Sequence, residues 1–414
     1  MKTRNRVFAK KTVKIGAAML LASYSLISAH AEMDVKANIG IGYDTNIYKA
    51  PSTSYLDYYP IPQNTGSILD AVPVTPRIHH GMFLPYDINI EGRKLTAPDV
   101  YFIGGYRLKG YRYFDPDYSN ANRNDHKFNI GARGLINKSG VKEEYVEGNI
   151  LFGHQRRLYL DRDYGDNHTL TSNPLSGDVA TRYIYDYTGL ELSYKDRVSS
   201  LQKLASLHIE KRDYYDVPGI NETQYDNTYT AIKFGIDKKL TKPMKLGVDY
   251  KYYTYDFVER KAKNSNGRLV TGTTRKYTYN QLKFTLRYRM SKAWLHTGTL
   301  EYKTRKDDYV GYDDYTKIGA GIRTQWDSAD KMNRVKGAYT WWKRDYPNAY
   351  AFDNGKFYTE QKKYDGTTLE LAYIRKLSEQ LDLNCNYQRI DENTTDTRYQ
   401  YLRSLYQVGV EYQF

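Results

Sequence analysis

Few side chains in this sequence have the types and spacing that metal binding requires. The run 161–167 supplies Asp and Asn oxygens for calcium, but it lacks the distal glutamate and the spacing of an EF-hand loop. His79 and His80 are adjacent, and adjacent residues of a strand point to opposite faces. We therefore expect a solvated loop at 161–167 and no metal at His79 or His80.

Catalytic chemistry is also weakly represented. His154, His168 and His208 could act as general bases, but no nucleophile motif stands near them. Cys385 is the single cysteine, which excludes a disulfide framework and any Cys-based zinc or iron–sulfur site. We expect a protein without enzymatic activity and without a cofactor, and an outer-membrane hydrolase is the third functional alternative.

Cations at every second position are the stronger chemical feature. Lys283, Arg287 and Arg289 occupy one parity of a segment, and Leu282, Phe284, Leu286 and Tyr288 occupy the other. Since strand side chains alternate between faces, one face is cationic and the other apolar. A cationic wall concentrates anions, whereas cross-strand salt bridges would give a packed lumen. The pattern assigns anion selectivity to Lys283, Arg287, Arg289, Lys303, Arg305, Lys245, Lys251 and Arg323.

The elements that carry this alternation are strands of about 10–15 residues, longer than the usual ~5–6 of soluble proteins. Tight turns are expected near 96–98, 137–140, 196–197, 240–242, 291–292, 328–330 and 377–378. Long polar loops are expected near 49–80, 115–124, 159–180, 214–226, 258–275, 306–314, 345–360 and 390–398. This alternation of turns and loops predicts an all-β fold, a transmembrane antiparallel β-barrel of about sixteen strands in a Gram-negative outer membrane.

The composition agrees with such a barrel. The mean hydropathy is −0.76, yet 45 of the 414 residues are Tyr, and disordered chains are poor in aromatics. In a barrel only half of each strand contacts lipid, so a low hydropathy is expected. Most Tyr residues are expected in interfacial girdles. Tyr253, out of phase with the lipid row, and the loop residues Tyr55, Tyr58 and Tyr59 could instead stack on sugars.

The first residues predict export. Six basic residues precede an apolar stretch at 15–27 and the sequence Ala29-His30-Ala31, as in a secretory signal peptide cut after Ala31. The alternative, an N-terminal anchor, would need a longer apolar stretch. We expect residues 1–31 to be the signal peptide and 32–414 to be one barrel domain. Without the six basic residues of the signal peptide the net charge falls from +14 to +8, which favours acidic glycans or lipid headgroups as partners. Because the chain is expected to be exported, we expect no nucleic-acid partner.

Both ends of the mature chain carry motifs. The last strand alternates Val408, Val410, Tyr412 and Phe414, and it resembles the C-terminal signal recognised by the barrel-assembly machinery. The first strand ends in Gly42, Tyr43, Asp44 and Asn46. This segment resembles the putative β-barrel porin families that accompany exopolysaccharide export, and also the barrel of surface lipoprotein assembly modifiers. Asp44 and Asn46 could bind a sugar or tie down the first outer loop.

The resemblance implies a porin-like channel that passes an anionic or neutral saccharide, a polysaccharide or small solutes through a net-basic lumen. Outer-membrane lipids and polysaccharide-export components would be its partners. The alternative is a closed barrel that acts as a surface-interaction or assembly scaffold through its long outer loops.

Overall fold

The computed structural model describes residues 32–58, 71–76, 78–139, 142–157, 184–198, 200–214, 225–267, 269–353 and 356–414. The expected signal peptide at 1–31, the run 161–167, His168 and Tyr59 lie outside these residues. Within the described residues, two short 3₁₀ turns, η1 (Pro116–Ala121) and η4 (Thr397–Tyr399), occur in outer connections. No helix in the described parts of the chain is long and apolar enough to cross a membrane.

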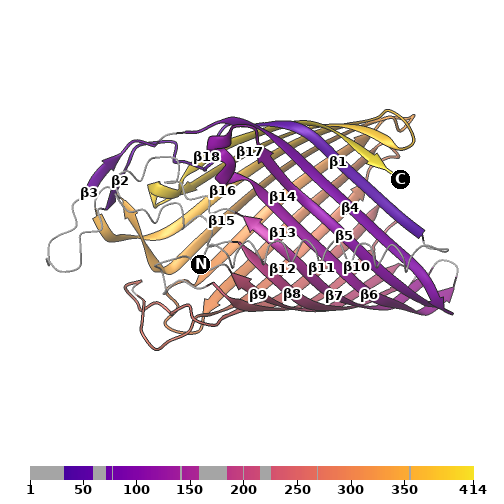
Figure 1. The fold of residues 1–414 in the computed structure, drawn as a ribbon, viewed down its shortest axis with the longest axis horizontal. Helices are drawn as coiled ribbons and strands as arrows, with labels where there is room; N and C mark the ends of the chain where they lie inside the picture. Colours follow the sequence, from indigo (N-terminus) through magenta and orange to yellow (C-terminus); the bar gives the residue numbers. More distant parts are fainter. Residues whose placement is uncertain are drawn as a thin grey trace.

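Sixteen antiparallel strands close into one barrel, as the sequence predicts (Figure 1). Each strand pairs with its neighbour in the chain order, and β1 closes the barrel by pairing with both β18 and β4. The barrel strands are β1 (Glu32–Asp44), β4 (Gly81–Ala97), β5 (Val100–Tyr113), β6 (Arg123–Ser139), β7 (Lys142–Arg157), β8 (Tyr185–Val198), β9 (Leu201–Tyr214), β10 (Asn227–Lys239), β11 (Met244–Phe257), β12 (Lys276–Arg289), β13 (Trp294–Asp307), β14 (Tyr315–Asp327), β15 (Asn333–Asp353), β16 (Lys356–Lys376), β17 (Leu381–Thr394) and β18 (Tyr401–Gln413).

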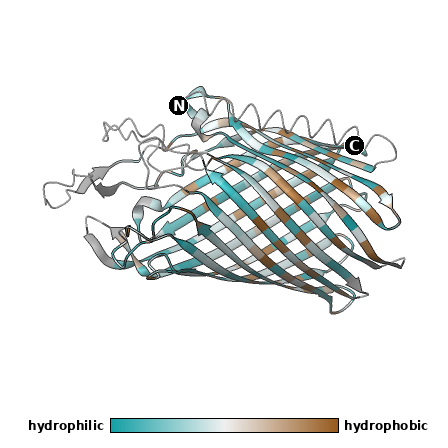
Figure 2. Ribbon diagram, turned by 60° about the horizontal axis from the view of Figure 1, so that its bottom comes forward, coloured by the Kyte–Doolittle hydropathy of each residue, from teal (hydrophilic) through white to brown (hydrophobic). Residues whose placement is uncertain are grey.

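The outer face of the barrel is apolar. Large side chains on one parity stay exposed in the isolated chain, among them Ile41, Phe234, Phe284, Leu300, Ile322 and Val408. Figure 2 shows hydrophobic and hydrophilic residues recurring along the strands of the barrel wall. A closed sheet leaves no unpaired edge, so it satisfies its backbone hydrogen bonds within lipid. The chain is an outer-membrane β-barrel, and its apolar parity contacts the bilayer.

Most of the expected turns and loops are confirmed by the strand bounds, and the loop expected at 159–180 lies outside the described residues. The short connections share one end of the barrel with the C-terminus, and the long ones share the other end (Figure 1). In outer-membrane barrels the long loops are extracellular, so the loop-bearing end is called the outer end below. The long connection from β1 to β4 contains a separate hairpin of β2 (Tyr55–Tyr58) and β3 (Ala71–Val74).

Four expected connections are wrong in position. The turn expected at 137–140 comes later, because β6 continues to Ser139. The turn expected at 196–197 belongs to β8, which continues to Val198. The loop expected at 390–398 starts later, because β17 runs to Thr394. The loop expected at 345–360 is a hairpin, since β15 and β16 stay paired as far as Asp353 and Lys356, with register shifts after Asp345. Pro347 and Asn348 have loop-forming character, but the cross-strand pairing outweighs it, and this hairpin extends outward beyond the rim (Figure 1).

Close packing at the seam between β1 and β4 depends on Gly42. A Cβ placed on Gly42 would lie 2.4 Å from the Phe83 ring, which is itself 3% exposed and packs on Tyr111 and Tyr113. The ring therefore occupies the space that a side chain at Gly42 would need.

We expect Gly42→Ala to lower the free energy of unfolding by about 1–3 kcal/mol, since it overpacks a filled site. Urea unfolding of the vesicle-reconstituted protein measures this. Gly298→Ala is the matched control, because nothing lies within 4 Å of a Cβ there. Equal stability of the two variants would contradict the packing argument.

Candidate functional site in the barrel lumen

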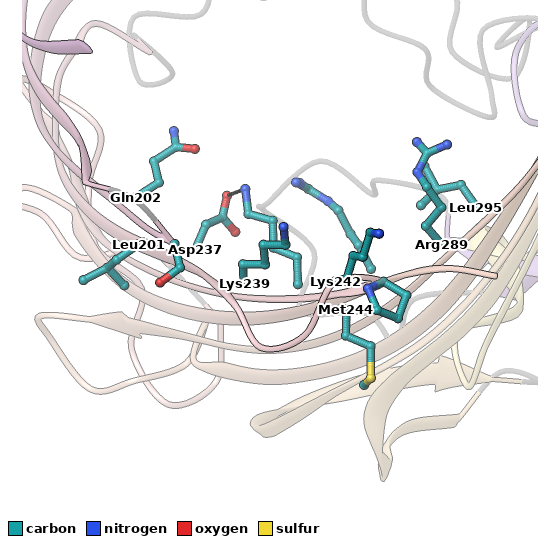
Figure 3. Close-up of a pocket in the computed structure, with 12 residues that line it drawn as sticks. Leu201, Gln202, Asp237, Lys239, Lys242, Met244, Arg289 and Leu295 are labelled. Atoms are coloured by element: carbon teal, nitrogen blue, oxygen red, sulfur yellow. Dashed lines mark ion pairs between the residues drawn. The ribbon is translucent and has the colours of Figure 1, made fainter. Parts of the chain in front are cut away.

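The inner end of the lumen carries unpaired cations. Arg287 and Arg289 of β12 are exposed on the lumen wall and help to line a hollow of about 330 Å³ together with Gln202, Asp237 and Lys245. In Figure 3 Gln202, Asp237 and Arg289 extend to the interior, whereas Met244 points to the opposite side of the wall. Neither these two arginines nor Lys283 forms an ion pair with any residue that the structure describes.

Other lumen cations are paired across strands. Lys245 lies 2.9 Å from Asp237, and Arg323 lies 3.6 Å from Glu370. Lys233–Asp249 and Lys317–Glu301 form similar pairs at 3.1 and 3.7 Å. The lumen therefore contains both arrangements that the sequence allows. Cross-strand salt bridges occur beside a row of cations on β12 that form no ion pair with a described residue.

Lys251, Lys303 and Arg305 lie further outward, among tyrosines. The Lys303 ammonium is 5.1 Å from the ring centre of Tyr279, and the Arg305 guanidinium is 4.6 Å from that of Tyr277. Lys251 lies 4.9 Å from the ring centre of Tyr253. The eight residues assigned to selectivity thus fall into three groups. Lys283, Arg287 and Arg289 form an inner row without ion pairs among the described residues, and Lys245 and Arg323 are in salt bridges. Lys251, Lys303 and Arg305 lie in an outer zone of cation–π contacts.

These tyrosines form a belt inside the outer end of the lumen, hereafter the tyrosine belt. Tyr253 and Tyr279 stack at 4.4 Å with an angle of 5° between their planes. Arg212 and Arg344 lie over further rings at 4.6–5.5 Å. The belt consists of Tyr185, Tyr229, Tyr253, Tyr255, Tyr277, Tyr279, Tyr315, Tyr346 and Tyr364, contributed by strands β8, β10–β12 and β14–β16.

The expectation that most tyrosines form girdles missed this belt, although Tyr253 was assigned to the lumen. Tyr277 and Tyr279 share the parity of Lys283, while the lipid-facing position between them is Thr278. Tyrosine is amphipathic, so residue type alone does not separate lumen-facing from lipid-facing tyrosines. The odd or even position of each tyrosine along its strand is the sequence feature that does. Lipid-facing tyrosines do occur at Tyr250, Tyr252, Tyr288, Tyr302, Tyr339 and Tyr406. Tyr55 and Tyr58 are on the β2 strand.

The first-strand motif lies in a buried polar cluster at the outer end of β1. Asp44 is fully buried and accepts hydrogen bonds from Tyr113 Oη at 2.6 Å and from Arg403 Nε at 3.0 Å. Asn46 donates to the carbonyl oxygens of Ala50 and Leu402 at 2.9 and 3.1 Å. These bonds attach the start of the first outer connection to β18.

A second polar cluster joins two outer connections over the tyrosine belt. Asp313 accepts hydrogen bonds from Lys263 Nζ at 3.1 Å and from Tyr277 Oη at 2.7 Å, and Arg275 Nη1 lies 3.7 Å away. Burial by itself would raise the pKa of Asp313, but Lys263, the Tyr277 hydroxyl and two arginines outweigh it and lower the pKa. The Asp313 carboxylate therefore holds residues 258–275 against the outer end of the wall.

The remaining motif residues face lipid. Tyr43 packs near His80 at 6.0 Å, and Val408, Val410 and Tyr412 pair with β17 on the apolar parity. Cys385 pairs with Val408 on the same face.

The histidines are held by carboxylates or aromatic rings. His154 lies 2.8 Å from Asp186, and His208 lies 3.0 Å from Glu210. His79 packs edge-on against Tyr48 and Tyr118. Within the described ranges, no three His, Cys, Asp or Glu side chains are grouped closely enough to hold a metal ion.

Comparison with solved structures finds other outer-membrane barrels at low identity. A loop-deletion mutant of OmpT from Vibrio cholerae has a TM-score of 0.46 at 11% identity, over 93% of this chain and 99% of that one. An anion-selective porin from Comamonas acidovorans has a TM-score of 0.41 at 12% identity (93% and 99%). A bacterial polysaccharide outer membrane secretin has a TM-score of 0.43 at 9% identity (91% and 98%).

No protein-family model matches the sequence, and no curated protein matches it. Similarities as low as those to the solved structures carry no inference about function. The barrel is established by its own strand pairing.

The Asp44–Arg403 pair gives a stability prediction. We expect Arg403→Gln to destabilise the barrel by about 3–5 kcal/mol, since it leaves a buried carboxylate without its cation. Unfolding of Arg403→Gln, Asp44→Asn and the double variant measures the coupling. A double variant that loses as much stability as the two single losses combined would show that the groups do not interact.

The Asp313 cluster gives a pH prediction. The pKa of Asp313 in the folded chain lies below its ordinary 3.8, so its stabilisation is complete above that value and is lost as the pH falls through the lowered pKa. We expect residues 258–275 to stay protected from amide hydrogen exchange at neutral pH and to lose protection in strong acid. Asp313→Asn should lose this protection at every pH, and a variant that stays protected would refute the role of Asp313.

Proposed function

We propose that this protein is an outer-membrane channel that passes an anionic or neutral saccharide, or a polysaccharide, through a lumen lined by tyrosines and cations. The supporting observation is the tyrosine belt, in which Lys251, Lys303, Arg305 and Arg344 lie within cation–π distance of inward-facing rings. A barrel that served only as a membrane anchor would not need such a wall.

The chemistry of the belt suits sugars. The C–H faces of a pyranose ring pack on aromatic rings, and phenol hydroxyls exchange hydrogen bonds with sugar hydroxyls. Guanidinium groups bind carboxylate or phosphate substituents in a bidentate manner. Half-buried members such as Tyr255 and Tyr346 would offer these contacts to a passing chain. Conduction requires several contacts that are each weak enough to release the solute.

The inner row would complete the path. Lys283, Arg287 and Arg289 have no carboxylate partner among the described residues, so their charge acts on the solution in the lumen. An unpaired row of cations raises the local concentration of anions and repels cations. In this proposal the row sets charge selectivity, and the tyrosine belt sets selectivity for saccharides over simple ions.

A surface scaffold is the second candidate, because two hairpins extend beyond the barrel at the outer end. The β15–β16 hairpin continues the barrel wall outward, and the β2–β3 hairpin is also at the outer end (Figure 1). Paired strands in this position could present a surface to polysaccharide-export components. A folded barrel that conducts no ions would favour this candidate.

Single-channel recording in planar bilayers tests the channel proposal. We expect an anion-selective conductance that acidic oligosaccharides block from the outer side. Tyr255→Ala/Tyr346→Ala removes two half-buried rings of the belt and should weaken the block about tenfold, since aromatic contacts of ~0.5–1.5 kcal/mol each are lost. Lys283→Glu/Arg287→Glu/Arg289→Glu should abolish or reverse the anion preference.

Two controls locate the effects. Tyr250→Ala/Tyr302→Ala removes lipid-facing rings and should leave the block unchanged. Lys233→Gln/Asp249→Asn removes both members of an ion pair, keeps the net charge of the lumen and should leave ion selectivity nearly unchanged. Silence from correctly folded protein would overturn the channel proposal, and an equal loss of block in the two tyrosine pairs would overturn the role of the belt.

A further inference from the structure

A second group of cations lies outside the lumen, on the lipid-facing side of β4–β7 at their outer ends. Arg112 and Arg156 flank Asn124, which is paired with Arg156 across β6 and β7. The Tyr86 hydroxyl donates to Asn124 and interacts electrostatically with both arginines. These four residues, Tyr86, Arg112, Asn124 and Arg156, are called the outer arginine cluster.

The outer arginine cluster lies where an apolar surface ends. Directly inward on the same face, Tyr106 stacks on Phe128 with ring centres 4.6 Å apart, and Ile130 and Ile150 are exposed. In an outer-membrane barrel this boundary is the headgroup level of the outer leaflet. The cluster therefore faces lipid headgroups, with acyl chains against the apolar surface below it.

The two arginines of the cluster lack an ion-pair partner among the described residues, whereas lysines at other positions on the lipid-facing side have one. Both are exposed, and neither forms an ion pair with any residue that the structure describes. Elsewhere on the lipid-facing side, lysines have an aspartate within 4 Å: Lys211–Asp213 near the outer end of β9, Lys276–Asp256 at the outer end of β12, and Lys343–Asp345 midway along β15. The positive charge of those lysines is compensated by aspartates of the protein. The positive charge of Arg112 and Arg156 is available to an external anion.

The histidines beside the cluster are engaged with the protein. His126 lies 3.1 Å from the Tyr106 hydroxyl, and its ring centre is 6.2 Å from that of His154. His154 in turn is held by Asp186 at 2.8 Å. Because Asp186 contacts His154, it does not neutralise Arg156 or Arg112, and both arginines can bind an external anion.

We propose that the outer arginine cluster binds the phosphorylated headgroup of a glycolipid of the outer leaflet. Arg112 and Arg156 stand on strands two spacings apart, about 10 Å, so their long side chains can approach one phosphate from both sides. Tyr86 and Asn124 between them supply groups that hydrogen-bond sugar hydroxyls. The apolar surface inward of the cluster favours a lipid over a free phosphate, because it accommodates the acyl chains.

Lipid retention by the purified full-length protein tests this proposal, with native mass spectrometry as the readout. The probes are bis-phosphorylated lipid A, dephosphorylated lipid A with the same acyl chains, and phosphatidylglycerol. We expect the wild-type protein to bind bis-phosphorylated lipid A at least tenfold more tightly than the other two. Arg112→Gln/Arg156→Gln should remove that preference and leave the channel conductance unchanged.

The control variant is Lys211→Gln/Lys276→Gln, which removes two lipid-facing cations that already have aspartate partners, and it should keep the preference. Equal binding of the two forms of lipid A to wild-type protein would overturn the proposal, and this comparison does not depend on the folding of any variant. Equal binding of phosphatidylglycerol would overturn the glycolipid assignment. An unchanged preference in the double arginine variant would overturn the assignment of the site.

Discussion

The structure depends on one constraint: a sheet that lies in lipid must satisfy every backbone amide and carbonyl within itself. Closure of β1 on β18 and β4 meets this requirement and leaves no edge. Closure also fixes which residues of each strand face lipid and which face the lumen. Side chains that act on the solute can therefore stand only at every second position. On β12 this gives Leu282 outside and Lys283 inside, and the same rule holds around the barrel.

Within that rule the lumen keeps cations in two different ways. In the inner half they stand in water or beside carboxylates, as Lys245 does beside Asp237. In the outer half Arg305 and Arg344 lie over the faces of Tyr277 and Tyr364, both at 4.6 Å. The negative face of an aromatic ring stabilises a cation without cancelling its charge. Tyrosine thus allows several cations to stand close together in a partly buried wall.

The sequence predicts the barrel well because its signals are local. Parity, turn residues and strand length each extend over a few residues, and together they lead to sixteen strands and to the lumen side of Lys283 and Arg287. The Asp44–Arg403 pair is not visible in this way, because 359 residues separate its members. Tyrosine at Tyr277 and Tyr279 suits both interface and lumen, so its role follows only from parity. The extent of the β15–β16 hairpin was missed because Pro347 and Asn348 mimic a loop. The selectivity roles of the cations remain predictions.

The buried pair of Asp44 and Arg403 joins the beginning of the barrel to its final strand. A ribosome makes Asp44 long before Arg403, and until β18 is in place the carboxylate has no cation to compensate it. A barrel closed without its last strand would bury a lone negative charge in a low-dielectric wall, which is strongly unfavourable. Burial of Asp44 is therefore favourable only in a chain that includes β18 and its Arg403. A chain that lacks its final strand would close only with the electrostatic cost of a buried, uncompensated carboxylate.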